Sequence, residues 1–127
     1  MMEFRSSLGR ARGLGSAKEG VGHWWAQRVT AIALVPLSIW FVLAAISLLG
    51  ADHATFAAWL GTFGNALLMA LLVIVLFYHA QLGMQVVIED YVSGHAALIT
   101  TLLIVRFALF ALAASCLLAI ILVALKG

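Results

Sequence analysis

Three long stretches of the sequence contain no charged side chain. Val29–Ala51 runs for 23 residues, His53–Ile88 for 36 and Phe107–Leu125 for 19 without Asp, Glu, Lys or Arg. About 20 apolar residues cross the hydrocarbon layer of a bilayer as an α-helix, because each residue advances the helix by about 1.5 Å. The pattern therefore predicts an all-α membrane protein with three transmembrane helices.

The predicted spans lie near Ala26–Leu49, Phe63–Ile88 and Ala97–Ala124. We expect Ala51–Thr62, between the first two spans, to be a short turn outside the membrane. Pro36 lies a little before the middle of the first span and should bend it, because proline has no amide hydrogen to donate.

Composition leaves no room for a soluble domain. Of 127 residues, 65% are hydrophobic and 9% charged, and the mean hydropathy is +1.16. The first apolar run lies too far into the chain for a cleaved signal peptide, so it should remain as a span. The single cysteine, Cys116, cannot form an internal disulfide and is predicted to be a small packing residue. The net charge of +2 indicates membrane topology rather than nucleic-acid binding.

Orientation follows from the positive charges of the N-terminal segment. The loop after the first span has no Lys or Arg, whereas the N-terminal segment has five: Arg5, Arg10, Arg12, Lys18 and Arg28. The positive-inside rule therefore places the N-terminus in the cytoplasm. We expect residues 1–22 to form a cytoplasmic arm and residues 23–127 a three-helix transmembrane anchor domain. Trp24 and Trp25 mark the boundary, because indole rings settle at headgroup depth.

The second span carries a histidine inside the hydrocarbon and an acid at its inner end. Counted from His79, Gly83 lies at about 40°, Asp90 at about 20° and Tyr91 at about 120° around an ideal helix, and Asp90 lies about 16 Å further along its axis. Gly83, one turn from the histidine, is expected to leave open space in which a flat macrocycle could lie.

Several interpretations of His79 are compatible with the residue alone. It can be a neutral histidine that hydrogen-bonds to a neighbouring helix, or a haem ligand, a proton relay or another metal ligand. Ionisable groups inside a membrane tend to mark function. Zinc would require three or four converging ligands, and no second histidine or carboxylate is expected at this depth. Haem requires only one protein ligand on each face.

A shared haem follows if His79 binds a six-coordinate iron. The two axial histidines of such a haem lie at nearly the same depth. The other histidines of the chain, His23, His53 and His95, are all predicted near membrane surfaces. The second ligand would therefore come from another chain.

Arg106 and the Asp90–Tyr91 pair each allow two interpretations. Arg106 lies about 13 Å below the inner boundary, at the depth of His79, so it must face protein or a cofactor rather than lipid. It either pairs with an acid or carbonyls of a partner helix or lies against the cofactor.

Asp90 and Tyr91 are either an ordinary interfacial helix end or a quinone site, in which the phenol donates a hydrogen bond and the carboxylate assists proton delivery.

Two segments resemble a known family. GVGHWWAQRVTAIALVPL and, one span later, HAQLGMQVVIEDYV are similar to the small hydrophobic membrane-anchor subunit of bacterial succinate dehydrogenase, complex II. The resemblance covers all three spans, and the most specific part is His79 followed 11 and 12 residues later by Asp90 and Tyr91.

The resemblance implies roles for particular residues. His79 is an axial ligand of haem b, and a histidine of the second cytochrome b anchor subunit supplies the other. Tyr91 hydrogen-bonds ubiquinone, and Asp90 belongs to the same site through a charge partner on the other anchor. Arg28 and His23 are placed to meet haem propionates. Arg106 receives no role from the family.

The resemblance also implies a four-subunit enzyme of the bacterial inner membrane. A flavoprotein subunit with FAD oxidises succinate, an iron–sulfur subunit relays electrons, and two anchors bind haem b and form the ubiquinone site. This chain would hold no succinate chemistry and no catalytic residue. The alternatives are the anchor of a quinol:fumarate reductase, which works in the reverse direction, and a non-redox membrane scaffold whose His79 is merely hydrogen-bonded.

Overall fold

The computed structural model describes residues 16–126, and its regular elements are all α-helices. They are α2 (Ser16–Ser47), α3 (His53–Gly61), α4 (Phe63–Tyr91) and α5 (His95–Lys126). Three of them are long and apolar enough to cross a membrane, namely α4, α5 and the Val21–Ser47 part of α2. The predicted fold class and the three predicted spans are confirmed.

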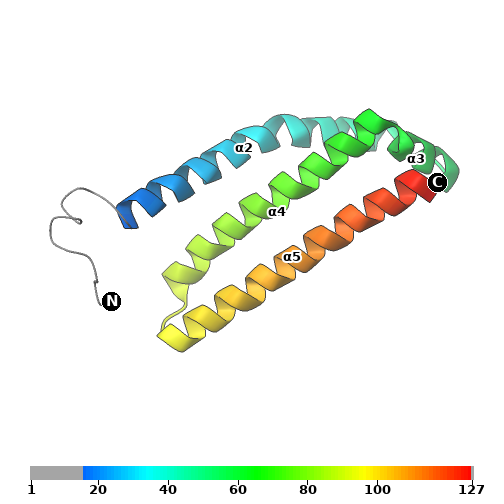
Figure 1. Ribbon diagram of the computed structural model, residues 1–127. Helices are drawn as coiled ribbons and strands as arrows, with labels where there is room; N and C mark the ends of the chain where they lie inside the picture. The colour runs from blue at the N-terminus through cyan, green and yellow to red at the C-terminus, as the bar shows by residue number, and fades with distance from the viewer. Residues whose placement is uncertain (1–15, 127) are drawn as a thin grey trace.

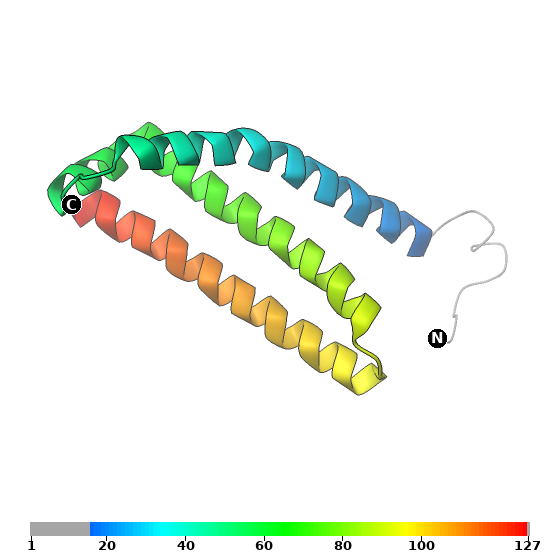
Figure 2. The same cartoon turned by 180° about the vertical axis from the view of Figure 1, so that it is seen from behind.

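The long helices lie side by side, with α4 in the middle (Figures 1 and 2). α4 packs against both α2 and α5, whereas no Cα atom of α2 lies within 8 Å of a Cα atom of α5 in residues 16–126. The start of α2 and the turn between α4 and α5 lie at one end of the molecule (Figure 1). The short helix α3 and the C-terminal end of α5 lie at the other end.

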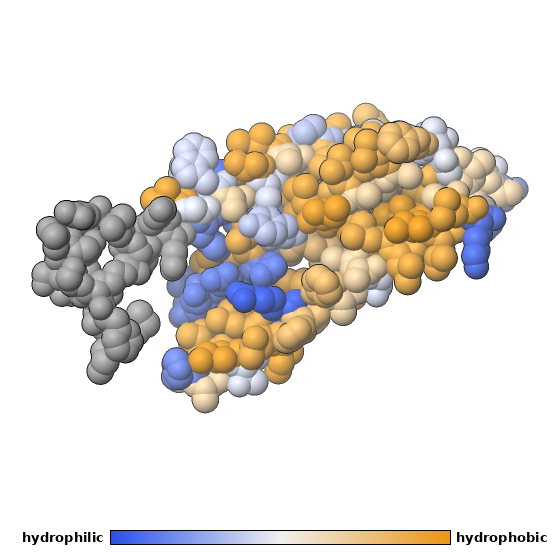
Figure 3. All heavy atoms as spheres, viewed as in Figure 1, coloured by the Kyte–Doolittle hydropathy of each residue, from blue (hydrophilic) through white to orange (hydrophobic). Residues whose placement is uncertain are grey.

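The molecule exposes most of its apolar surface. Only 6%, 17% and 6% of the most hydrophobic windows of α2, α4 and α5 are buried. Large side chains such as Ile32 and Phe110 stand 70% and 73% exposed. Figure 3 shows hydrophobic atoms over most of the visible face, with hydrophilic atoms gathered mainly at the end where α2 begins. Such a surface is suited to contact with lipid and with other membrane helices.

The prediction of a turn at Ala51–Thr62 is wrong in one respect, because most of this segment is the helix α3. The Asp52 carboxylate caps this helix by accepting a hydrogen bond of 2.8 Å from the Thr55 amide. Ala57 and Leu60, three residues apart on one face of α3, are each only 3% exposed. The cap and this apolar face stabilise a helix where length alone suggested a turn.

The best-packed part of the molecule lies where α3 meets α4 and α5. Leu60, Val73 and Ile120, one from each helix, form the buried cluster there. Cys116 packs against this cluster, as predicted for a small packing residue. The indole of Trp59 in α3 stacks on that of Trp40 in α2, with ring centroids 5.9 Å apart. The end of the molecule opposite the start of α2 is thus fastened by contacts among all four helices.

The first helix begins earlier than the predicted boundary between arm and anchor. α2 starts at Ser16, so the last part of the predicted arm at residues 1–22 is helical, whereas residues 1–15 lie outside the described residues. α2 continues without a break through Pro36. Figures 1 and 2 show it as an arch, which is the shape expected of a helix that lacks one backbone hydrogen bond.

The Asp52 cap should make α3 sensitive to acid. Hydrogen bonds from Thr55, its side chain first and its amide second, lower the pKa of the Asp52 carboxyl from its ordinary value. A carboxyl whose pKa is lowered by folding stabilises the fold above its unfolded pKa, and this contribution is lost as the pH falls through the folded pKa. We expect the hydrogen-exchange protection of the α3 amides to decrease in that acidic range.

The matched variants are Asp52→Asn, which keeps a cap that does not titrate, and Asp52→Ala, which removes the cap. Asp52→Asn should lose the acid sensitivity, and Asp52→Ala should show reduced protection at every pH. Equal protection in all three proteins would show that the cap does not hold α3.

Candidate functional site

The His79 ring is held by a threonine from another helix. His79 Nδ1 on α4 lies 2.8 Å from Thr30 Oγ1 on α2, across 49 positions of sequence. Thr30 is 9% exposed, and its hydroxyl is also 2.7 Å from the carbonyl oxygen of Ala26 and 3.1 Å from that of Gln27. In the described part of the chain, this is the one side-chain hydrogen bond that joins two of the three long helices. Residue spacing did not reveal Thr30.

Thr30 belongs to a polar stripe on α2 that includes His23 and Gln27. Counted from His23, Gln27 lies at about 40° and Thr30 at about −20°, so the three share one face of the helix. The Gln27 amide nitrogen is 3.8 Å from the place a Cβ on Gly83 would take. The space beside Gly83 is therefore filled by Gln27, which corrects the expectation that it stays open.

Two buried polar atoms of this stripe have no partner among the described residues. They are His23 Nε2 and Gln27 Oε1. Buried polar atoms normally have hydrogen-bond partners, so an unpaired one suggests a group that the isolated chain lacks. No group of three or more His, Cys, Asp or Glu side chains converges in residues 16–126. The stripe thus presents single polar atoms rather than a cluster of metal ligands.

Arg28 lies away from this stripe. It is about 140° around α2 from His23, counted on an ideal helix. Its side chain is exposed, and the guanidinium carbon sits 5.1 Å from the centroid of the Trp24 ring, a cation–π contact. Of the two residues expected near haem propionates, His23 shares the stripe with Thr30, and Arg28 does not.

Asp90 and Tyr91 form the last turn of α4. Both are exposed, Tyr91 to 84%, and the helix closes there with a 2.9 Å hydrogen bond from the Val92 amide to the carbonyl of Ile88. Glu89 and His95 beside them are exposed as well. The phenol and the carboxylate are thus open to a ligand or to another chain.

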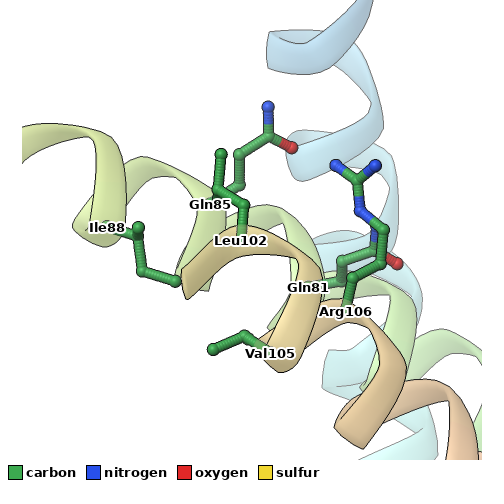
Figure 4. A pocket seen from close by; sticks show the side chains of 6 residues that line it. All are labelled: Gln81, Gln85, Ile88, Leu102, Val105 and Arg106. Atoms are coloured by element: carbon green, nitrogen blue, oxygen red, sulfur yellow. The ribbon is translucent and has the colours of Figure 1, made fainter. Parts of the chain in front are cut away.

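Arg106 lies at the seam between α4 and α5. Figure 4 shows its guanidinium on the same side of the seam as the amides of Gln81 and Gln85. Arg106 also lines a groove of about 390 Å³ between these helices. Gln81 is about 200° around α4 from His79. Arg106 therefore lies across α4 from the bond between Thr30 and His79.

These features define a class of protein. The chain is an integral membrane protein with three apolar helices, whose polar groups lie in the seams between helices and at the end where α2 begins. Most of its apolar faces are not covered by the chain itself. Such a chain suits a subunit that packs against partners in the bilayer.

Comparison with known proteins then gives the family. Residues 2–123 match the model of the succinate dehydrogenase/fumarate reductase transmembrane subunit. The chain belongs to this family, as the two segments that resemble it indicated.

Individual relatives agree. The chain is 37% identical over 105 residues to the succinate dehydrogenase hydrophobic membrane anchor subunit of Rickettsia conorii, covering 82% of this chain and 83% of the relative. It is 42% identical to that of Rickettsia bellii over 72% of this chain and 73% of the relative. It is 37% identical to that of Paracoccus denitrificans over 73% and 72%. No solved structure matches significantly. With its three apolar helices, the chain is a multi-pass protein of the bacterial inner membrane.

The contact at Gly83 predicts how the α2–α4 seam responds to substitution. An alanine Cβ would meet Gln27 at an ordinary contact distance of 3.8 Å, so Gly83→Ala should be tolerated. Gly83→Leu should push α2 from α4 and lower stability by about 1–3 kcal/mol, the usual cost of overpacking. The measurement is the apparent Tm of the assembled complex in mild detergent.

Gly64→Leu is the matched control, because nothing lies within 4 Å of a Cβ at Gly64 on the same helix. A Gly83→Leu protein with the Tm of Gly64→Leu would show that the two helices are not tightly packed at this point.

Proposed function

We propose that this chain is the membrane-anchor subunit of a succinate:ubiquinone oxidoreductase. In this proposal His79 supplies one axial ligand to a haem b shared with the second anchor, and Asp90 and Tyr91 form part of the ubiquinone-reduction site. The observation that carries it is the His79 imidazole, held at Nδ1 by Thr30 inside a membrane helix. A ring fixed by one nitrogen keeps its other nitrogen for a ligand.

The residues around His79 fit a haem. Nε2 of His79 is the candidate iron ligand, and His23 can donate a hydrogen bond from the buried Nε2 that has no partner in the described residues. A haem carries propionate carboxylates that accept such bonds. Bound haem b supplies a one-electron carrier within the bilayer. The role of this chain is to hold the iron ligand and to donate to the propionates.

The positions of the other histidines support a haem shared between chains. His53 is the first residue of α3 and His95 the first residue of α5, so both stand at helix ends. His23 lies near the start of the apolar part of α2. A second axial ligand at the depth of His79 is therefore expected from the second cytochrome b anchor subunit.

The end of α4 suits the chemistry of quinone reduction. Quinone takes up two electrons and two protons, so a site needs a hydrogen-bond donor to a carbonyl oxygen and a route for protons. The exposed Tyr91 phenol can donate this bond, and the Asp90 carboxylate beside it can assist proton delivery. Asp90 lies about 16 Å along the helix from His79. The helix α4 thus carries both the haem ligand, inside the membrane, and the residues of the quinone site, near the cytoplasmic surface of the membrane.

Orientation and partners complete the proposal. The start of α2 lies on the cytoplasmic side, so the Asp90–Tyr91 end of α4, at the same end of the molecule, faces the side on which electrons arrive. A flavoprotein subunit with FAD and an iron–sulfur subunit carry out succinate oxidation and electron relay, and this chain performs neither. The family model includes fumarate reductases, but the relatives found are anchors of succinate dehydrogenase, which favours succinate oxidation.

Removing the imidazole should remove the haem. We expect His79→Ala to lose most b-type haem from the purified complex, because the iron loses one of its two protein ligands. The measurement is the ratio of b-type haem to covalent or extractable flavin, from reduced-minus-oxidised optical spectra. His95→Ala is the control, since His95 is an exposed histidine at a helix end.

Full haem content in His79→Ala, with His95→Ala also unchanged, would refute ligation by His79. Wild-type complex without any b-type band would refute the haem and leave membrane anchorage and quinone binding as the proposed roles of this chain.

Removing the phenolic hydroxyl should separate quinone chemistry from haem binding. We expect Tyr91→Phe to retain haem and to oxidise succinate normally with a soluble artificial acceptor, but to reduce ubiquinone about a hundredfold more slowly, the lower end of the loss typical of one positioned proton or hydrogen-bond donor. The measurement is the ratio of the two steady-state rates. An unchanged ratio would remove Tyr91 from the quinone site.

A further inference from the structure

We propose that Thr30 is the positioning residue that sets which nitrogen of His79 binds iron. Its hydroxyl oxygen accepts the Nδ1 hydrogen of His79, so that the lone pair of the ring lies on Nε2. This inference rests on the proposed haem ligation by His79 and adds to it a residue of the other helix. Thr30 does not touch the iron and acts only through His79.

The direction of the hydrogen bonds follows from what each atom can do. A hydroxyl has one hydrogen, and carbonyl oxygens only accept. The Thr30 hydroxyl lies 2.7 Å from the Ala26 carbonyl and 3.1 Å from the Gln27 carbonyl, so its hydrogen points to its own helix. The oxygen then accepts, and His79 Nδ1 at 2.8 Å is the donor. With the hydroxyl hydrogen on the side of α2, a hydrogen bond between Thr30 and His79 exists only when Nδ1 carries a hydrogen.

The threonine is held firmly enough to orient a ring. Its side chain is β-branched, which limits rotation about χ1 on a helix, and it is 9% exposed. The two carbonyls near its hydroxyl, those of Ala26 and Gln27, belong to the preceding turn of α2. Gln27 packs over Gly83, so α2 approaches α4 closely one turn from this bond. The hydroxyl is therefore fixed by α2 before any ligand is present.

A hydrogen bond accepted from Nδ1–H also makes the imidazole a better electron donor. Hydrogen-bond acceptors behind a ligating histidine raise its basicity, and such partners tune the potential of the metal. A more basic ligand favours the ferric state. Loss of the Thr30 hydroxyl should therefore favour ferrous haem and raise its reduction potential.

The test compares Thr30→Val, which keeps the shape and removes the hydroxyl, with Thr30→Ser, which keeps the hydroxyl. Thr100→Val is the matched control, because Thr100 is exposed on α5. Each is purified as the whole complex, and its haem content and haem midpoint potential are measured. In Thr30→Val we expect the equilibrium preference for ferric over ferrous haem to fall about tenfold, which is the lower end of the usual effect of losing such a hydrogen-bond partner. A tenfold change raises the midpoint potential of a one-electron couple by about 59 mV.

Thr30→Ser and Thr100→Val should keep the wild-type potential. If Thr30→Val also keeps it while retaining haem, or if Thr30→Ser shifts as far as Thr30→Val, the hydroxyl has only a structural role and the inference is overturned. These outcomes differ from failure of the proposed function, in which His79→Ala would retain its haem.

A second measurement applies even if Thr30→Val does not assemble. Pulsed EPR of the ferric wild-type complex, with histidine labelled by ¹⁵N and with exchange into D₂O, detects the nitrogen remote from iron and whether it carries a hydrogen. We expect an exchangeable hydrogen on Nδ1 in wild type and in Thr30→Ser. A remote nitrogen without a hydrogen, or iron bound to Nδ1, would overturn the inference.

Discussion

The hydrogen bond between Thr30 and His79 is the interaction on which the arrangement of the site depends. Inside a bilayer no water can satisfy an imidazole, so another helix must do so. Side-chain hydrogen bonds between membrane helices contribute only about 0.6 kcal/mol on average, whereas an unpaired buried polar group costs about 1–3 kcal/mol. The bond therefore contributes little to stability. Its main effect is to fix the position of α2 relative to α4 and the orientation of the His79 ring.

The rest of the fold follows the same constraint. Helices satisfy their own backbone groups, and the apolar side chains that α2, α4 and α5 leave exposed can face lipid or partner helices. Within residues 16–126, the buried cluster of apolar side chains lies at the α3 end. At the opposite end lie Tyr91, Asp90 and His23, whose Nε2 has no partner among the described residues. The end with little packing of its own is the end where partners and ligands are proposed to bind.

The three spans could be predicted from the sequence because charge-free apolar runs of this length usually form transmembrane helices. It did not predict α3, since a helix of nine residues between spans is too short to stand out, although Asp52 and the apolar Ala57 and Leu60 were signals for it. His79 was found because an ionisable group in an apolar run is conspicuous. Thr30 was missed because threonine is common in membrane helices, and its partner is 49 residues away.

The position of Gln27 shows why side-chain packing was harder to predict than helices. Helical spacing correctly put Gly83 near His79 but could not tell which neighbouring helix would fill the space beside it. Arg106 is a similar case, since its depth was readable from the sequence and its position beside Gln81 of α4 was not. Depth follows from counting residues, whereas the facing helix depends on tertiary structure.

The most direct test of the shared haem is a high-resolution cryo-EM map of the complete complex in lipid. We expect a haem between this chain and the second anchor, with His79 Nε2 on the iron and Nδ1 still bonded to Thr30. A map in which the haem iron is bound only by other chains, or in which no haem lies beside His79, would contradict the proposed role of this histidine.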